Sequence, residues 1–370
     1  MINKIFSCLL IIFISCENKN SLNNGVTEID MSLGNNKETL CNLSKETQII
    51  ELESIPESLI GHVEKVKIAN GKIFIHDLQT QSLLIFEYPS GKFISKIHAV
   101  GNEQGSYSSL SAFDINVVNQ NIYILDGNRK RMLTYMLDGK YVESKELPVF
   151  THNFSYLNNS FAFFNYSISN DKSLDYQIIL TNTDLTIQEK AIPIGNKTSI
   201  NIKQINRISN YTSQATLLLP KDTPYAYEIK DHKISPKYYF NFKEKWNDEI
   251  FYSDYSSTSD LLGALKKNEI LYGLGAIEGE NFIEIDYWLI DKHFVSVYNK
   301  KTGKLSYIEH LKNFDFFPRG YYNGFFISVN YLQDLSKELN NKKADCLYNK
   351  SALSTNKNDT KNPVLILAKF

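Results

Sequence analysis

Short apolar runs separated by polar turns recur along the chain at a nearly constant spacing. The run Lys72–Asp77 is repeated as Asn121–Asp126, an offset of 49 residues, and each is followed by a second apolar run and a Gly-Lys turn. Short runs rich in Ile, Phe, Tyr and Leu predict β-strands. A repeat of about 40–50 residues made of such strands is typical of a propeller blade. Six blades of this size fill most of the 370 residues, so the sequence predicts an all-β, six-bladed β-propeller.

The last predicted blade is short of a strand. The pattern offers one or two strands in residues 324–330 and another in residues 364–370. Because a ring with unpaired blade edges is incomplete, we expect the strand at residues 49–52 to pair beside residues 364–370 and close the ring. Two short helical insertions are also predicted. One covers residues 261–267 after a Thr-Ser-Asp cap at residues 258–260, and the other places three leucines on one face of residues 332–339.

The N-terminus has the pattern of an export signal. Lys4 precedes an apolar core of about ten residues, which is too short to span a bilayer as a helix. The core ends in Ser-Cys, which resembles a lipobox, so we expect residues 1–16 to be a lipoprotein signal peptide with Cys16 as the lipidated residue. A plain signal peptide is the alternative. Residues 17–45 are polar and Asn-rich and predict a flexible tether, which leaves residues 46–370 for the propeller.

Composition narrows the classes of function. The chain carries 40 basic and 41 acidic residues, a balance that argues against a nucleic-acid-binding protein. Its sequence contains no metalloprotease, P-loop, nucleophile-elbow or C-x-x-C motif, and its seven histidines are scattered. We therefore predict no catalytic residue, no metal site and no cofactor.

Some polar positions recur in the repeat and others do not. Asp77 and Asp126 are equivalent positions, which favours a structural role in accepting backbone N–H bonds at a turn. The run Arg129, Lys130 and Arg131 does not recur, and neither does the loop that ends at Tyr107. Both loops are expected on one face of the propeller. Because Arg side chains match carboxylates and sulfates, these four residues are a candidate ligand site, and a solvated basic turn is the alternative.

Two cysteines remain outside the predicted signal. Cys41 precedes the expected closing strand, and Cys346 lies within the last blade. Exported compartments permit disulfides, so a bond between Cys41 and Cys346 is possible if the ring closes as expected. Two free thiols are the alternative.

Several segments resemble a known family. They are the lead-in at residues 50–61, the spacing Gly101-x-x-x-Gly105-x-Tyr107, and the terminus that begins at Asn362. On these segments the chain is similar to the six-bladed β-propeller lipoproteins of Bacteroidetes, which are related to NHL and TolB-like propellers. The resemblance implies the propeller fold and a location at the cell surface. It implies no single activity.

Together these patterns favour a lipid-anchored binding protein. We expect a monomeric lipoprotein of the outer membrane or cell envelope that acts as a non-catalytic binding or scaffolding module for a glycan, peptide or protein, and not for nucleic acid. A propeller lyase or hydrolase with its site at the channel mouth is the alternative. A structural accessory of a larger envelope complex is a third possibility.

Overall fold

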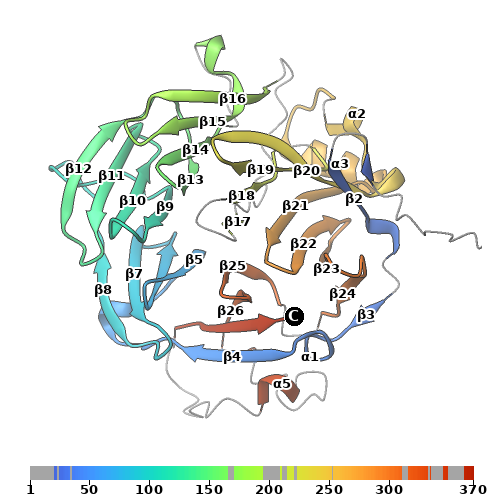
Figure 1. Ribbon diagram of the computed structural model, residues 1–370, viewed down its shortest axis with the longest axis horizontal. Coiled ribbons are helices and arrows are strands. Elements are labelled where there is room, and N and C mark those ends of the chain that lie inside the picture. Colours follow the sequence, from blue (N-terminus) through green and yellow to red (C-terminus); the bar gives the residue numbers. More distant parts are fainter. Residues whose placement is uncertain are drawn as a thin grey trace, which may run out of the picture.

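The protein is a ring of six β-sheet blades around a central axis (Figure 1). The computed structural model describes residues 21–22, 25–33, 36–165, 171–194, 209–210, 215–220, 223–251, 253–310, 316–331, 334, 345–348 and 362–370. The prediction of a six-bladed all-β propeller is confirmed.

The first three blades follow the chain in order, each as a four-stranded antiparallel sheet. Blade 1 comprises β5 (Val63–Ala69), β6 (Lys72–Asp77), β7 (Ser82–Glu87) and β8 (Phe93–Ile97). Blade 2 comprises β9 (Ala112–Asn116), β10 (Asn121–Asp126), β11 (Arg131–Met136) and β12 (Tyr141–Glu146). Blade 3 comprises β13 (Asn153–Leu157), β14 (Ser160–Phe164), β15 (Tyr176–Asn182) and β16 (Ile187–Pro193).

Blades 4 and 5 each gain strands from the N-terminal segment. Blade 4 comprises β17 (Ser209–Asn210), β18 (Ala215–Leu218), β19 (Tyr225–Lys230) and β20 (Lys233–Asn241), and β2 (Val26–Asp30) and β1 (Ser21–Leu22) extend its outer edge. Blade 5 comprises β21 (Leu271–Glu278), β22 (Phe282–Leu289), β23 (Lys292–Asn299) and β24 (Leu305–Ile308), with β3 (Lys37–Glu38) outside.

Blade 6 joins the two ends of the chain. It comprises β25 (Pro318–Tyr322), β26 (Phe325–Asn330), β27 (Val364–Lys369) and, as its outer strand, β4 (Glu46–Glu51). β4 runs antiparallel to β27, with Ile50 opposite Leu365. The predicted closure of the ring by the N-terminal strand is therefore confirmed. Asn362 adds to it, because its side chain donates to Glu53 O and Ser58 O at 2.8 Å and accepts from Ile60 N at 2.9 Å.

The predicted flexible tether needs correction for residues 26–45. β2 pairs in parallel with β20, from Thr27 opposite Tyr238 onward, and β3 pairs in parallel with β24. The apolar side chains of Val26 and Ile29 alternate along β2 and are buried. A short burial pattern of this kind is easily lost within a polar, Asn-rich composition. Residues 1–20, which include the predicted signal peptide and Cys16, lie outside the described residues.

The helices are short and lie outside the blades. α3 (Thr258–Lys267) begins after Ser257, whose hydroxyl accepts from Asp260 N, and it buries Leu261 and Leu265. The first predicted helix is confirmed, and it begins three residues earlier than predicted, with the predicted cap residues inside it. The second falls outside the described residues except for Asp334. The remaining turns of helix are α1 (Leu40–Leu43), α2 (Asp248–Phe251), α5 (Asp345–Tyr348), η1 (Met31–Leu33), η2 (Pro56–Ser58), η3 (Lys172–Leu174) and η4 (Lys243–Lys245).

The core is divided among the contacts between neighbouring blades. Phe74 and Leu83 of blade 1 pack with Phe113 and Ile124 of blade 2, and comparable apolar clusters join the other neighbouring blades. Because each blade is buried on two faces, its second strand is almost continuously buried, as in β6 and β10. Fully buried charged side chains such as Asp77 and Asp126 are exceptions. None of the helices in the described ranges is long and apolar enough to cross a membrane.

Candidate functional site

The two repeat-equivalent aspartates hold the loops that lead into their blades. Both carboxylates are fully buried. Asp77 accepts hydrogen bonds from Gly61 N and His62 N at 2.9 and 2.8 Å. Asp126 accepts from Ser108 N and Ser108 Oγ at 2.8 and 2.7 Å. The predicted structural role of both aspartates is confirmed, because each satisfies backbone donors of the loop between blades.

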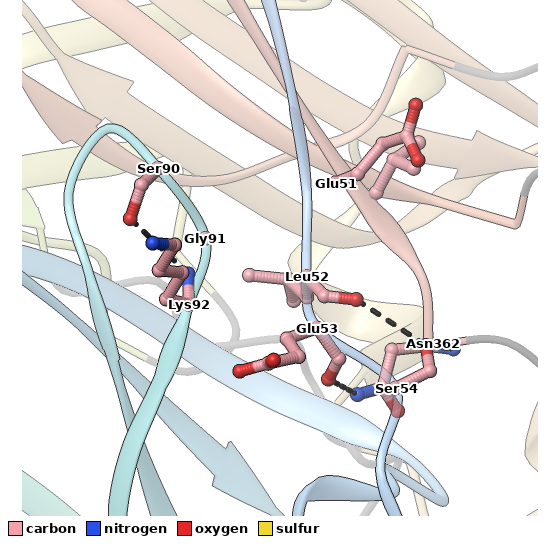
Figure 2. A pocket seen from close by; sticks show the side chains of 9 residues that line it. Glu51, Leu52, Glu53, Ser54, Ser90, Gly91, Lys92 and Asn362 are labelled. Carbon is pink, nitrogen blue, oxygen red and sulfur yellow. Dashed lines mark hydrogen bonds between the residues drawn. The ribbon is translucent and has the colours of Figure 1, made fainter. Parts of the chain in front are cut away.

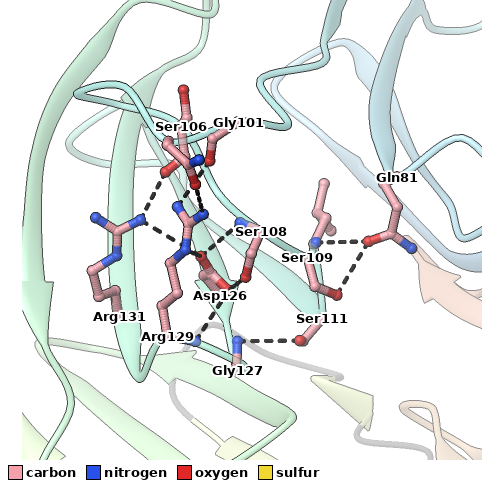
Figure 3. A network of polar contacts seen from close by, with 12 residues as sticks. Gln81, Gly101, Ser106, Ser108, Ser109, Ser111, Asp126, Gly127, Arg129 and Arg131 are labelled. Atoms are coloured by element: carbon pink, nitrogen blue, oxygen red, sulfur yellow. Dashed lines mark hydrogen bonds and ion pairs between the residues drawn. The ribbon is translucent and has the colours of Figure 1, made fainter.

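The basic run of blade 2 is used within the fold, as Figure 3 shows. Arg129 donates to Gly101 O at 2.8 Å and also to the Asn102 side chain. Arg131 donates to Ser106 O at 2.8 Å and lies 3.6 Å from Asp126 Oδ2. The two guanidinium groups therefore satisfy carbonyl oxygens of the preceding loop, and their role in holding a ligand stays a prediction.

The other two candidates of that site have structural positions as well. Tyr107 is fully buried, and its hydroxyl donates to Gln81 O at 2.8 Å, which leaves no surface for a ligand. Lys130 adopts a left-handed turn conformation with φ 51°, and its carbonyl accepts from Leu147 N at 2.8 Å. A solvated, structured turn describes this region better than a binding face.

A pocket of about 250 Å³ lies at the seam between the last and first blades (Figure 2). Its wall includes Glu53, whose carboxylate accepts from Phe93 N at 2.8 Å and whose N–H donates to Gly91 O at 2.9 Å. Gly91 has a φ of 71°, and a Cβ there would lie 1.9 Å from Glu51 O. Only glycine allows this approach. Glu53 therefore holds the segment after the closing strand to the β7–β8 turn of blade 1.

A different charged group lies on the innermost strands of blades 1 and 2. Lys67 of β5 forms an ion pair with the fully buried Asp114 of β9. Asp114 also accepts from Tyr156 N of blade 3 at 2.8 Å. Burial alone would raise the pKa of Asp114, but the ammonium groups of Lys67 and Lys65 hold it below the usual value. This carboxylate therefore connects three blades at the axis.

Lys65 lies two residues before Lys67 on the same side of β5. Its ammonium group donates to Phe113 O at 3.0 Å and lies 5.3 Å from the centre of the Phe113 ring. Burial lowers the pKa of Lys65 to about 8, and the like charge of Lys67 acts in the same direction while Asp114 opposes it. Within the described residues Lys65 forms no ion pair of its own.

His76 is buried directly beside this lysine. Lys65 is its partner across the β5–β6 pair, the ring is 1% exposed, and the Phe113 ring meets it edge-on at 6.4 Å. Its Nε2 has no hydrogen-bond partner among the described residues. Burial and the charge of Lys65 lower the pKa of His76 to about 4. The imidazole is therefore neutral at physiological pH, and perturbed groups of this kind gather at functional sites.

Sequence reasoning missed Lys65 and Lys67. The available signal was a charge reversal between equivalent strands, since Lys67 pairs with Phe74 and Asp114 pairs with Tyr123, and Phe74 and Tyr123 are repeat equivalents. These residues carry the chemistry of an anion site, with two cations against one carboxylate. No group of three or more His, Cys, Asp or Glu side chains in the described part of the chain could hold a metal ion.

The structure contains a disulfide between Cys41 and Cys346. It links α1, just before the closing strand, to α5 in the insertion of blade 6. Thr47 Oγ1 of β4 donates to Cys346 O at 2.9 Å, and Leu40 and Leu347 are buried in one apolar cluster. The disulfide therefore belongs to the closure of the ring.

Comparisons with solved structures agree on the fold. A Bacteroides fragilis protein whose name marks its export as inferred aligns with a TM-score of 0.74 at 17% identity, over 93% of this chain and 99% of that one. A member of the DUF4221 family from Bacteroides vulgatus aligns with a TM-score of 0.55 at 10% identity, over 88% and 96%. At these identities the likeness shows the fold alone. No curated protein matches the chain, and the family model that matches, over residues 26–369, is described as a domain of unknown function, DUF4934.

Proposed function

The chain belongs to the DUF4934 family, and we propose that this member is a lipid-anchored envelope protein whose propeller binds an anionic ligand at the axis. The anionic group is carried by a glycan, a peptide or a protein partner. The propeller acts as a binding or scaffolding module and performs no catalysis. The site lies between blades 1 and 2 and includes Lys65, Lys67 and Asp114.

One observation carries this proposal, which is the position of two lysines of β5 around one fully buried carboxylate. Lys65 and Lys67 face a single buried carboxylate, and that carboxylate pairs with Lys67. The side chain of Lys67 is 22% exposed, and Lys65 is also partly exposed. An ammonium group that is partly desolvated and already fixed by a carbonyl oxygen favours an added anion, because charge-assisted hydrogen bonds are stronger away from bulk water.

The proposed location in the envelope comes from the N-terminal pattern, and the inferred export of the similar Bacteroides fragilis protein supports it. We expect the protein in the membrane fraction, and a Cys16→Ser variant in the soluble fraction of the envelope, because acyl chains supply the membrane affinity. Fractionation followed by immunoblotting measures this. A Cys41→Ser variant is the control and should remain in the membrane fraction. Membrane retention of Cys16→Ser would contradict the lipid anchor.

The anion site is tested with the Lys65→Met variant, which keeps most of the aliphatic stem and removes the charge. Calorimetric titration with two carboxylate probes, a glutamate trimer and a galacturonate trimer, gives the affinities. We expect wild-type protein to bind a probe and Lys65→Met to bind it about 10- to 100-fold more weakly, the usual effect of a lost charge-assisted hydrogen bond.

A matched control and a pH series sharpen this test. Lys96 is exposed on β8, so Lys96→Met should bind as the wild type does. Because the pKa of Lys65 is about 8, the ammonium form is complete below pH 7, and affinity should fall as pH rises through 8. An ordinary lysine would keep its charge to about pH 10. The proposal would be contradicted if the wild type bound neither probe, or if the wild type and Lys65→Met bound a probe with equal affinity.

A further inference from the structure

Four side chains of blades 5 and 6 form a continuous series of ring contacts. The ring of Trp288 stacks on His293 with centroids 4.9 Å apart and 29° between planes. His293 meets Phe317 edge-on at 4.5 Å, and the Arg319 guanidinium lies 4.7 Å from the centre of the Phe317 ring. All four side chains are partly exposed. We call this series the aromatic ladder.

The aromatic ladder is held in place from beneath. His293 Nε2 lies 3.3 Å from Oδ1 of Asp286, which is fully buried on β22. β21 provides the space for this arrangement through two glycines. A Cβ at Gly275 would lie 2.5 Å from Asp286 Oδ2, and a Cβ at Gly273 would lie 3.2 Å from Trp288 Cδ1. The ladder is therefore fixed in its orientation, which reduces the entropy lost when a ligand binds.

The strand that carries Arg319 lies beside the strand that carries Lys65 and Lys67. Gly320 follows Arg319, and a Cβ at Gly320 would lie 2.7 Å from the carbonyl oxygen of Val66, which is the residue between Lys65 and Lys67. β25 and β5 are therefore in backbone contact at this point. Trp288 and His293 flank the β22–β23 turn, and Phe317 precedes β25. In an antiparallel blade the second turn and the start of the first strand share one face, so the ladder and Lys65 lie toward the same face of the ring.

These observations carry an inference about the ligand that rests on the proposed function. We propose that the aromatic ladder and Lys65 form one extended site for an acidic saccharide, whose carboxylate lies at Lys65 and Arg319 and whose sugar rings pack along Trp288. Aromatic side chains offer an apolar face with polar groups at the margin, which suits the C–H face of a pyranose. A guanidinium fork suits a uronate carboxylate. A peptide anion would use the cations but would gain little from the ladder.

The test compares ligands matched in shape or in charge. The probes are galacturonate and glucuronate trimers, their methyl esters, and a glutamate trimer, each titrated calorimetrically against the full protein. We expect a uronate trimer to bind at least about tenfold more tightly than both its ester and the glutamate trimer, since about 1.4 kcal/mol corresponds to tenfold. Trp288→Ala should remove most of the advantage over the glutamate trimer, while leaving affinity for the glutamate trimer unchanged.

Two variants separate this inference from the proposed function. Lys65→Met should weaken all anionic probes together, whereas Trp288→Ala should weaken the saccharides alone, and Trp288→Phe should restore part of their affinity. Unchanged binding of the glutamate trimer also shows that Trp288→Ala is folded. If the glutamate trimer binds as tightly as every uronate and Trp288→Ala changes nothing, the saccharide inference is overturned and the anion site stands. If no anionic probe binds, both are overturned.

Discussion

Reduction of the Cys41–Cys346 disulfide is expected to lower the free energy of unfolding by about 2–5 kcal/mol. The bond joins residues 305 positions apart, so it strongly restricts the unfolded chain, and the cost of closing a loop grows with its length. It also holds α5 against α1 and against β4, the strand that closes the ring. Denaturant unfolding followed by intrinsic fluorescence, with and without reductant, measures the difference.

A double variant provides the matched control for this experiment. Cys41→Ser combined with Cys346→Ser should unfold at the midpoint of the reduced wild type and should be insensitive to reductant. Hydrogen exchange should locate the weakening in β4 and β27, because these strands form the closure. Coincident midpoints for oxidised and reduced wild type, or two free thiols found by mass spectrometry of the native protein, would contradict the expectation.

Acidification from pH 6.5 to 4 is expected to destabilise the fold through His76 by up to about 3 kcal/mol. The folded pKa of His76 is about 4, because of burial and the adjacent Lys65 charge, against an ordinary value of 6.5. Between these values the unfolded chain binds a proton that the folded protein excludes. Stability contributed by the neutral imidazole is therefore present above pH 6.5 and is lost as pH falls to 4.

Comparison with variants isolates this contribution from the carboxylates that titrate in the same range. His76→Gln keeps a hydrogen-bonding side chain without a titrating group, so its unfolding free energy should fall less steeply between pH 6.5 and 4 than that of the wild type. His232→Asn alters an exposed histidine in a left-handed turn, where Asn is tolerated, and should follow the wild type. Equal slopes for His76→Gln and wild type would contradict the assignment.

The closure of the ring was predictable from sequence, whereas the axial group of Lys65, Lys67 and Asp114 was not. The last blade lacks a strand, and a spare strand precedes the first blade. Pairing the two fills both unpaired edges, and the structure shows this pairing with Ile50 opposite Leu365. The axial lysines escaped because the repeat was aligned on the second strands, 49 residues apart, whereas Lys67 and Asp114 are separated by 47. The β9–β10 turn is two residues longer than the β5–β6 turn, and this difference in length hid their equivalence.

The structural contacts of the basic run in blade 2 were not predictable for a different physical reason. A sequence gives the number of donors in Arg129 and Arg131 but not the carbonyl oxygens that accept from them. Those acceptors, Gly101 O and Ser106 O, belong to an irregular loop, and its need for donors has no signature in composition. The basic run does not recur in the other blades because it meets a local structural requirement of this loop. The residues of the aromatic ladder lie in three strands and a loop, so they form no contiguous motif.

The order in which the N-terminal segment meets the rim has a mechanical consequence. β2 lies on blade 4, β3 on blade 5 and β4 on blade 6 (Figure 1). A pulling force applied at the N-terminus therefore acts on the β2–β20 strand pair first and on the β3–β24 strand pair second, before it reaches β4. Each of these two strand pairs can separate and re-form at the outer edge of its blade while the β4–β27 pair, which closes the ring, carries no load. In a protein tethered at its N-terminus, the two outer strand pairs therefore take up a pulling force before it reaches the strand pair that closes the ring.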